Sequence, residues 1–283
     1  MRNMAKNNDS NSNKEAQNPR KKSGGWKGPI IIVLIIALLF TGVFYDVYRL
    51  GNDNILFLFV DEEKGIPGTV EVASVIVFSN LRPNGGSLDI DPLSTNPALD
   101  YLGININNSL IKTSDLSQGV ENAKQISKDE SKIDISRVVI IDSETLKELV
   151  DVVGYVPVDF KQQINILDQD RDIIVKGNIT GTMAKQIVQG KTFPVVDSTV
   201  IKDVPETSLW RIKSKTIGEV SLSMLDLAKY DKKTKRDISY KILRLYREDK
   251  IKVYNKNMTL ILIDVLPEGF GRIIMDFAVD VIS

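Results

Sequence analysis

The feature that most constrains this chain is an uninterrupted apolar segment near its beginning. Seventeen residues without a charge run from Pro29 to Tyr45 (PIIIVLIIALLFTGVFY). As a helix rising about 1.5 Å per residue, the segment covers roughly 26 Å of the ~30 Å hydrocarbon core of a bilayer, with Trp26 and Tyr48 near the two interfaces. A helix buried in a soluble core would carry a polar stripe, and this one has only Thr41. The pattern predicts a membrane span over residues 29–48.

The charges on the two sides of the span predict its orientation. Residues 1–28 carry seven basic and two acidic side chains, whereas residues 46–283 carry 30 basic and 35 acidic ones. Positive flanks stay on the cytoplasmic side, so we expect a single-pass protein of the cell membrane with its N-terminus inside and its C-terminal region outside. A cleaved signal peptide is the alternative, but the apolar segment is long for one and no small-x-small cleavage site follows Phe40.

The basic segment 1–28 is polar and rich in Asn, with almost no large apolar side chain before the span. Such a composition cannot bury enough surface to offset chain entropy, which predicts a disordered cytoplasmic tail. The tail also lacks the aromatic or repeated basic elements of a nucleic-acid-binding segment, so we expect no nucleic-acid partner.

The chain contains no Cys and no His. This excludes a disulfide framework, a thiolate nucleophile, a Cys/His zinc site and a Ser–His or Cys–His catalytic pair. Any chemistry must therefore come from carboxylates, Lys and Arg, hydroxyl groups, or a metal ion bound by oxygen ligands.

Apolar runs alternate with helical patterns in the external region, residues 49–283. Asp142 and Thr180 each precede a helical pattern in the N-cap position, and Gly154 follows the first of these helices. The strand–helix–strand order predicts an α/β sandwich, a mixed central sheet with parallel pairs and helices on both faces. We expect strands at 54–60, 71–78, 87–90, 137–141, 155–158, 251–254, 258–265 and 272–279, and helices at 115–127, 143–153, 181–188, 217–229 and 233–248.

Two stretches, Val138–Phe160 and Gly181–Lys191, resemble the LytR-CpsA-Psr (LCP) family of bacterial cell-envelope proteins. The first has a strand ending in Asp, a Leu-Val-Asp helix and a Val-Pro-Val-Asp strand, as in that family. Val72–Ile76 and Asn178–Gly181 are similar, more closely still, to an uncharacterised group of archaeal membrane-anchored proteins related to LCP domains. The resemblance covers roughly residues 30–250 and implies an LCP-like α/β fold.

The resemblance also implies a chemistry from which this sequence departs. LCP enzymes are phosphotransferases that move a glycopolymer from a polyprenyl (pyro)phosphate carrier onto the cell wall, using Arg and Asp to clamp the pyrophosphate and hold Mg²⁺. Where the family has Arg-x-Asp, this chain has Glu71 and Ala73, and where it has Pro-Arg-Asp, this chain has residues 89–92 (DIDP). Gln189 and Lys191 replace the later Arg-x-Arg, so the arginines of the phosphate clamp are missing.

Three functional hypotheses follow from the resemblance and its departures. The first is an extracytoplasmic envelope protein whose degenerate LCP-like domain binds or scaffolds a lipid-linked glycan or another envelope component, without catalysis or a cofactor. The second is an enzyme, an Mg²⁺-dependent glycopolymer phosphotransferase acting on polyprenyl-phosphate-linked substrates. The third is a purely structural surface protein.

The enzyme hypothesis has few candidate residues. Asp61, Asp89 and Asp91 are the carboxylates that could hold a divalent ion, and Arg82 and Lys191 are the cations that could bind phosphate. Each also has a simple structural explanation, as polarity at a strand end or turn, or as a charge on a helix surface. No further metal site is predicted.

The external region holds three sequons for N-glycosylation, at Asn107, Asn178 and Asn257. Glycosylation at these asparagines depends on the organism. Asn178 also precedes the expected capping residue Thr180, which gives it a structural reading as a turn residue.

Overall fold

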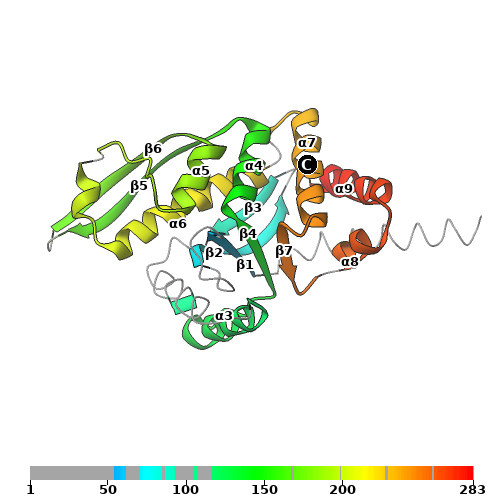
Figure 1. The fold of residues 1–283 in the computed structure, drawn as a ribbon, viewed down its shortest axis with the longest axis horizontal. Helices are drawn as coiled ribbons and strands as arrows, with labels where there is room; N and C mark the ends of the chain where they lie inside the picture. Colours follow the sequence, from blue (N-terminus) through cyan, green and yellow to red (C-terminus); the bar gives the residue numbers. More distant parts are fainter. Residues whose placement is uncertain are drawn as a thin grey trace, which may run out of the picture. The chain divides into compact units, whose positions relative to one another are not determined.

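A computed structural model of the chain describes most of the region that follows the apolar segment (Figure 1). The chain divides into two units, Met1–Leu39 and Phe40–Ser283, and every described residue belongs to the second. The predicted tail and the predicted span at 29–48 lie outside the described residues. Within the described part, no helix has both the length and the apolar character required to cross a membrane. The described residues are 54–61, 71–84, 87–92, 105–106, 116–166, 169–197, 199–226, 229–256 and 258–282, with the backbone alone for 71–92.

A mixed five-stranded sheet forms the centre of the described region. Its order is β3-β2-β1-β4-β7. The pair β1 and β4 is parallel, and the other three pairs are antiparallel. The expected mixed sheet with a parallel pair is therefore present. The strands are β1 (Ile55–Asp61), β2 (Glu71–Asn84), β3 (Ser87–Pro92), β4 (Arg137–Asp142) and β7 (Ile251–Tyr254).

Both faces of this sheet are covered, which explains why β1 and β4 are continuous apolar runs in the sequence. Ile55, Phe59 and Ile141 belong to one core cluster, while Leu58 and Val138 belong to another. Successive residues of a strand point to opposite faces, so the two clusters lie on the two faces of the sheet. We call the first the large face and the second the small face.

Helices cover the two faces unequally (Figure 1). On the small face, α3 (Leu116–Ser131) contributes buried Val120 and Ala123. The helices of the large face are α4 (Ser143–Val153), α5 (Gly181–Val188), α6 (Glu206–Leu225) and α7 (Lys232–Arg247). The expected helices at 143–153, 181–188 and 233–248 are confirmed, and so are helices on both faces of the sheet.

A second, two-stranded sheet follows α4, formed by β5 (Tyr155–Ile166) and β6 (Gln169–Thr180). The two strands pair antiparallel over their whole length. The expected strand at 155–158 therefore exists, but it does not return to the main sheet beside β4. Helix α6 packs against both β5 and β2, and so connects the second sheet to the first.

Two expected strands are wrong, because residues 258–265 and 272–279 are helical. They form α8 (Met258–Val265) and α9 (Glu268–Ile282). Short runs rich in Ile, Leu and Val fit a strand and a buried helix equally well by pattern. Tertiary contacts decide here, since the guanidinium of Arg247 donates to the carbonyl oxygens of Ile263 and Leu266, both at 2.9 Å, at the end of α8.

The expected helix at 217–229 is also misplaced, since α6 already begins at Glu206, directly after Pro205, and ends at Leu225. Its interior is buried on several sides, with Ile212, Thr216 and Ile217 all inaccessible to solvent. A helix enclosed in this way has no single apolar stripe, and its periodicity is therefore weak. A 3-10 turn at Val200–Asp203 precedes it.

Candidate functional site

Asp61, the first predicted carboxylate, lies at the edge of the main sheet where the parallel strands β1 and β4 both end. A bulge precedes it, because Phe59 pairs with Ser74 whereas Val60 pairs with Val72. Such bulges redirect a strand end and its side chains. The Asp61 side chain is only 1% exposed. A carboxylate buried to this extent requires polar partners inside the protein.

One polar partner of Asp61 comes from the end of α5, 128 residues further along the chain. The side-chain amide of Gln189 donates to Oδ1 of Asp61, with 3.4 Å between Nε2 and Oδ1. Gln189 is itself 4% exposed. The structure therefore brings together a buried carboxylate and a buried, uncharged amide, and no local sequence pattern links these two residues.

A Schellman motif at the end of α5 holds Gln189 in this position. Gly190 has φ 66°, the left-handed region that favours glycine. Its N–H donates to the carbonyl oxygen of Ile187 at 2.9 Å, and the N–H of Lys191 donates to that of Gln186 at 2.8 Å. The Gln-Gly sequence at the end of an amphipathic helix is the signal that could have predicted this geometry. Lys191 itself is exposed.

The beginning of α4 forms a second side of the site. Asp142 ends β4 and caps α4 by accepting a hydrogen bond from the backbone N–H of Thr145, as predicted. In the first turn of α4, Glu144 accepts from Nζ of Lys185 on α5 at 2.7 Å. This hydrogen bond lowers the pKa of Glu144, so the carboxylate is ionised at neutral pH. Lys185 therefore joins the two helices that flank Asp61.

Helices α4 and α5 approach each other closely at Gly181. A Cβ atom at this position would lie 2.5 Å from the backbone oxygen of Lys147 and 2.2 Å from Oδ1 of Asp151. No larger residue fits there without a shift of α4. The glycine that belongs to the family resemblance thus has a packing role, because it sets the distance between the two helices.

The other candidates of the enzyme hypothesis lie on the β2–β3 hairpin. Arg82 pairs with Asp89 in the backbone register, and Asp91 pairs with Ser79. Asp61, in contrast, pairs with Glu71 at the opposite end of β2. Glu71 and Arg82 are eleven positions apart along β2, a length of roughly 36 Å in an extended strand. The backbone does not bring Asp61 together with the carboxylates and the arginine of the hairpin.

One of the three sequons falls within the described residues. Asn178 is exposed on β6, where it pairs with Pro157. Thr180, the third residue of the sequon, caps α5, since its Oγ1 accepts from the N–H of Met183 at 3.4 Å. Asn107 and Asn257 lie outside the described residues.

A second polar cluster, not anticipated from the sequence, surrounds Glu148 on the outer side of α4. Three cations approach its carboxylate: Lys241 at 2.5 Å, Lys250 at 3.0 Å and Arg244 at 3.5 Å. The hydrogen bond from Lys241 lowers the pKa of Glu148, and the one from Lys250 adds to the effect. The cations belong to α7 and the residues after it, where the pattern indicated only a helix with an apolar face.

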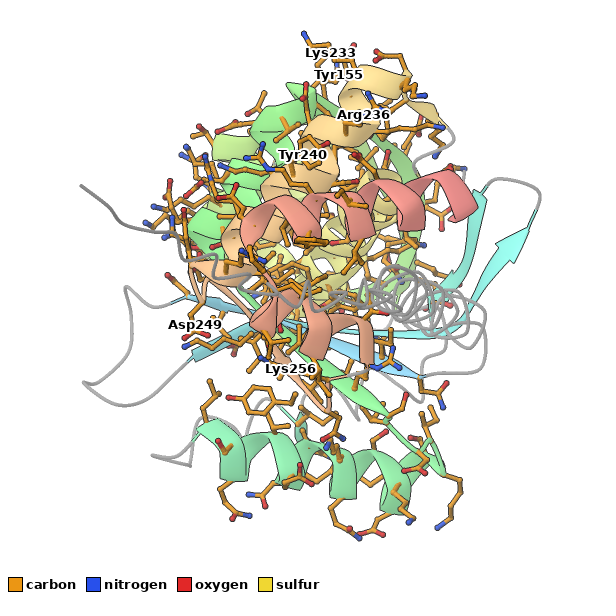
Figure 2. All side chains as sticks on the ribbon, turned by 90° about the vertical axis from the view of Figure 1, so that its right-hand side faces the viewer. Tyr155, Lys233, Arg236, Tyr240, Asp249 and Lys256 are labelled. Atoms are coloured by element: carbon orange, nitrogen blue, oxygen red, sulfur yellow. The ribbon has the colours of Figure 1, made fainter. Side chains whose placement is uncertain are left out.

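Two cavities adjoin α7. One, of about 580 Å³, is bounded by α4, α7 and α9 and is lined by several charged side chains, among them Arg244, Glu248 and Arg272. Figure 2 shows Tyr240 and Arg236 on α7; the Tyr240 hydroxyl donates to Asp276 of α9 at 2.9 Å. The other, of about 660 Å³, lies beside β7 and is lined by charged side chains that include Lys252, Lys256 and Asp264.

The contact described for Asp61 is a hydrogen bond from an uncharged amide. Carboxylates accept hydrogen bonds, and an amide both donates and accepts, which suits ligands rich in hydroxyl groups. Among the residues that the structure describes, no three carboxylates lie together in a way that could hold a metal ion. Lys185 is already engaged by Glu144.

Comparison with known proteins gives matches to solved structures alone. No protein-family model matches the chain, and no curated protein matches it. The structure is similar to a LytR-Csp2A-Psr enzyme from Actinomyces oris, with 10% identity over 81% of this chain and 77% of that one, at a TM-score of 0.42. It is also similar to B. subtilis TagV, with 13% identity over 81% and 79% of the two chains, at a TM-score of 0.43.

A structure described as a transcriptional regulator from Enterococcus faecalis is similar to the same degree. It shares 14% identity over 83% of this chain and 74% of that one, at a TM-score of 0.41. The chain is thus a mixed α/β protein with LCP enzymes among its structural neighbours.

Proposed function

We propose that this chain is a membrane-anchored, extracytoplasmic cell-envelope protein whose LCP-like domain binds a lipid-linked glycan without catalysing its transfer. The apolar segment at 29–48 anchors it, with the N-terminus in the cytoplasm. The domain recognises the sugar part of the ligand by hydrogen bonding. Neither a metal ion nor another cofactor takes part.

The contact between Gln189 and Asp61 carries this proposal. The resemblance aligns Gln189 with an arginine of the phosphate clamp, and in this structure the amide lies 3.4 Å from the buried carboxylate. An amide has no charge with which to stabilise a pyrophosphate, and phosphoryl transfer depends on charge stabilisation and positioning. The substitution therefore favours ligand binding over transfer.

The register of β2 supports the same conclusion. A transferase that used Asp61 together with Arg82 would need both in one cleft, yet the register places Arg82 beside Asp89 and about a strand length along β2 from the partner of Asp61. Lys185, the described cation between α4 and α5, forms an ion pair with Glu144. An ion-paired lysine, and an amide where the resemblance places a clamp arginine, support binding without transfer.

The proposal can be tested with the full-length protein in lipid nanodiscs. Two probes are compared by native mass spectrometry, a polyprenyl phosphate carrying a disaccharide and the same polyprenyl phosphate without sugar. We expect the protein to retain the first in preference to the second. Release of the sugar or of phosphate in the presence of Mg²⁺ should stay at the background level in both the wild type and Asp61→Asn.

Two outcomes would contradict the proposal. Mg²⁺-dependent release by the wild type that is lost in Asp61→Asn would establish the transferase alternative. Retention of neither probe would leave the purely structural alternative.

A further inference from the structure

Exposed apolar side chains gather on the two C-terminal helices. Of the seven large apolar side chains that are exposed among the described residues, four lie on α8 and α9. Ile261 and Val265 are four residues apart on α8, and Phe270 and Ile273 are three apart at the start of α9, so each pair shares one helix face. We call these four residues the α8–α9 surface. Soluble surfaces rarely cluster such residues without a partner.

The α8–α9 surface belongs to an ordered part of the fold. Ile263 and Ile274, on the inner sides of the two helices, are buried in the large-face core. Arg247 of α7 donates to the terminal carbonyl oxygens of α8, and a Cβ at Gly271 would lie 2.8 Å from the same guanidinium. The inner sides of both helices are therefore fixed by packing, which also fixes the position of the α8–α9 surface.

Helix α8 begins beside the edge of the sheet where β1 starts. The strands β1 and β4 start together in parallel, with Ile55 opposite Arg137. The antiparallel strand β7 ends at this same edge, with Tyr254 opposite Val138, and α8 follows four residues later. Hydrogen bonds tie the edge together, from Ser136 N to Asn54 O at 2.9 Å and from Asn255 Nδ2 to Ser136 O at 3.1 Å.

The predicted membrane span ends close to this edge along the chain. Six residues, 49–54, separate the end of the span at Tyr48 from the start of β1 at Ile55. Even fully extended, that connection covers at most about 25 Å. The edge from which α8 departs is thereby kept near the bilayer.

We propose that the α8–α9 surface docks onto the bilayer that holds the anchor, with its four apolar side chains in the interfacial region. The inference rests on the anchor in the proposed function. Two helices that present apolar side chains outward while their other faces are packed are suited to lie in the plane of such an interface.

The charges beside the surface predict how it binds. Lys256 pairs with Asp264 at 2.8 Å, and Arg272 pairs with Glu268 at 2.6 Å. Lys256, labelled in Figure 2, lies two residues before the start of α8 in the chain. Because each of these cations has an acidic partner, docking depends on apolar burial rather than on anionic lipid. It should respond little to salt.

The absence of cysteine in the chain allows a clean test. The single-cysteine variants Val265→Cys and Val196→Cys are reconstituted at full length in liposomes and labelled with an environment-sensitive fluorophore. Both positions are exposed valines, at 71% and 64%, and Val196 lies beside β6 of the second sheet. We expect lipid-attached nitroxide to quench the label at 265 and aqueous iodide to quench the label at 196, at both low and high salt.

The outcomes separate this inference from the anchor. If the protein floats with the liposomes in alkaline carbonate but both labels are quenched by iodide alone, the anchor stands and the docking is wrong. If the label at 265 is shielded from both quenchers and the unlabelled variant forms a disulfide-linked dimer when an oxidant is added, the surface binds a second copy, which also overturns the proposal. Failure to float would remove the anchor and the docking together.

Discussion

The two faces of the five-stranded sheet differ in what covers them. The large face is covered by α4, α5, α6 and α7, and its core continues into the second sheet. The small face is covered by α3, and its buried cluster is much smaller. The two polar contacts described at the candidate site, from Gln189 to Asp61 and from Lys185 to Glu144, come from helices of the large face. The position of the site thus depends on the packing of the large face, and changes in the packing of the small face should affect the site less.

The largest expected effect is on the free energy of unfolding, at two neighbouring residues of β1. Phe59 and Leu58 point to opposite faces of the sheet and are 1% and 0% exposed. Phe59→Ala should lower the free energy of unfolding by roughly 3–5 kcal/mol, since a large cavity opens among several fixed helices. Leu58→Ala should cost about 2–3 kcal/mol, since α3 can move inward and fill part of the space. Urea unfolding of the full-length protein in detergent, followed by Trp fluorescence, measures both. An equal or larger loss for Leu58→Ala would show that the two faces are equally rigid.

A smaller effect is expected at the beginning of α4, on the large face. Asp142→Ala removes the side chain that accepts from Thr145 N and should destabilise the protein by about 1 kcal/mol. Thr180→Ala is the matched control on α5, where the capping distance is longer, at 3.4 Å, and the loss should be smaller. Amide hydrogen exchange at Thr145 reports the cap directly. Unchanged exchange there in Asp142→Ala would contradict the assigned role.

The smallest effect is a pH-dependent one at Glu148, which joins α4 to α7. Its folded-state pKa is lowered below 4.5 chiefly by the hydrogen bond from Lys241. The ionised form therefore contributes stability above about pH 4.5, and this contribution is lost as the pH falls through the lower folded value. Glu148→Gln should reduce the free energy of unfolding by up to about 1 kcal/mol at pH 7. A difference from the wild type that stays constant down to pH 3 would show that the carboxylate charge is not responsible.

Local patterns predicted the elements whose features arise within a few neighbouring residues or from burial on both sides. The apolar runs of β1 and β4 are continuous because both faces are covered, and the caps at Asp142 and Thr180 use local hydrogen bonds. The errors at α8 and α9 have the opposite cause. Their apolar runs suit either structure, and the contact that ends α8 as a helix comes from Arg247, outside the run itself.

The candidate site was less predictable than the fold. Asp61 could be singled out as a carboxylate at a strand end, but its burial and its contact with Gln189 depend on packing across 128 residues. The second sheet was missed for a similar reason, because the sequence of β5 does not specify which strand it pairs with. The charged residues at the beginning of β6 (QDRD) also gave no sign of a strand, so β6 itself was not predicted.

The length of strand β1 sets the distance between Asp61 and the edge of the sheet where the strand begins. Its seven residues, at about 3.3 Å each, place Asp61 up to roughly 20 Å from the edge of the sheet where β1 begins. The phosphate of a polyprenyl carrier lies at the level of the lipid head groups, whereas its saccharides project outward from them. With the proposed anchor near that edge, a site raised by the length of one strand would face the saccharides of such a ligand.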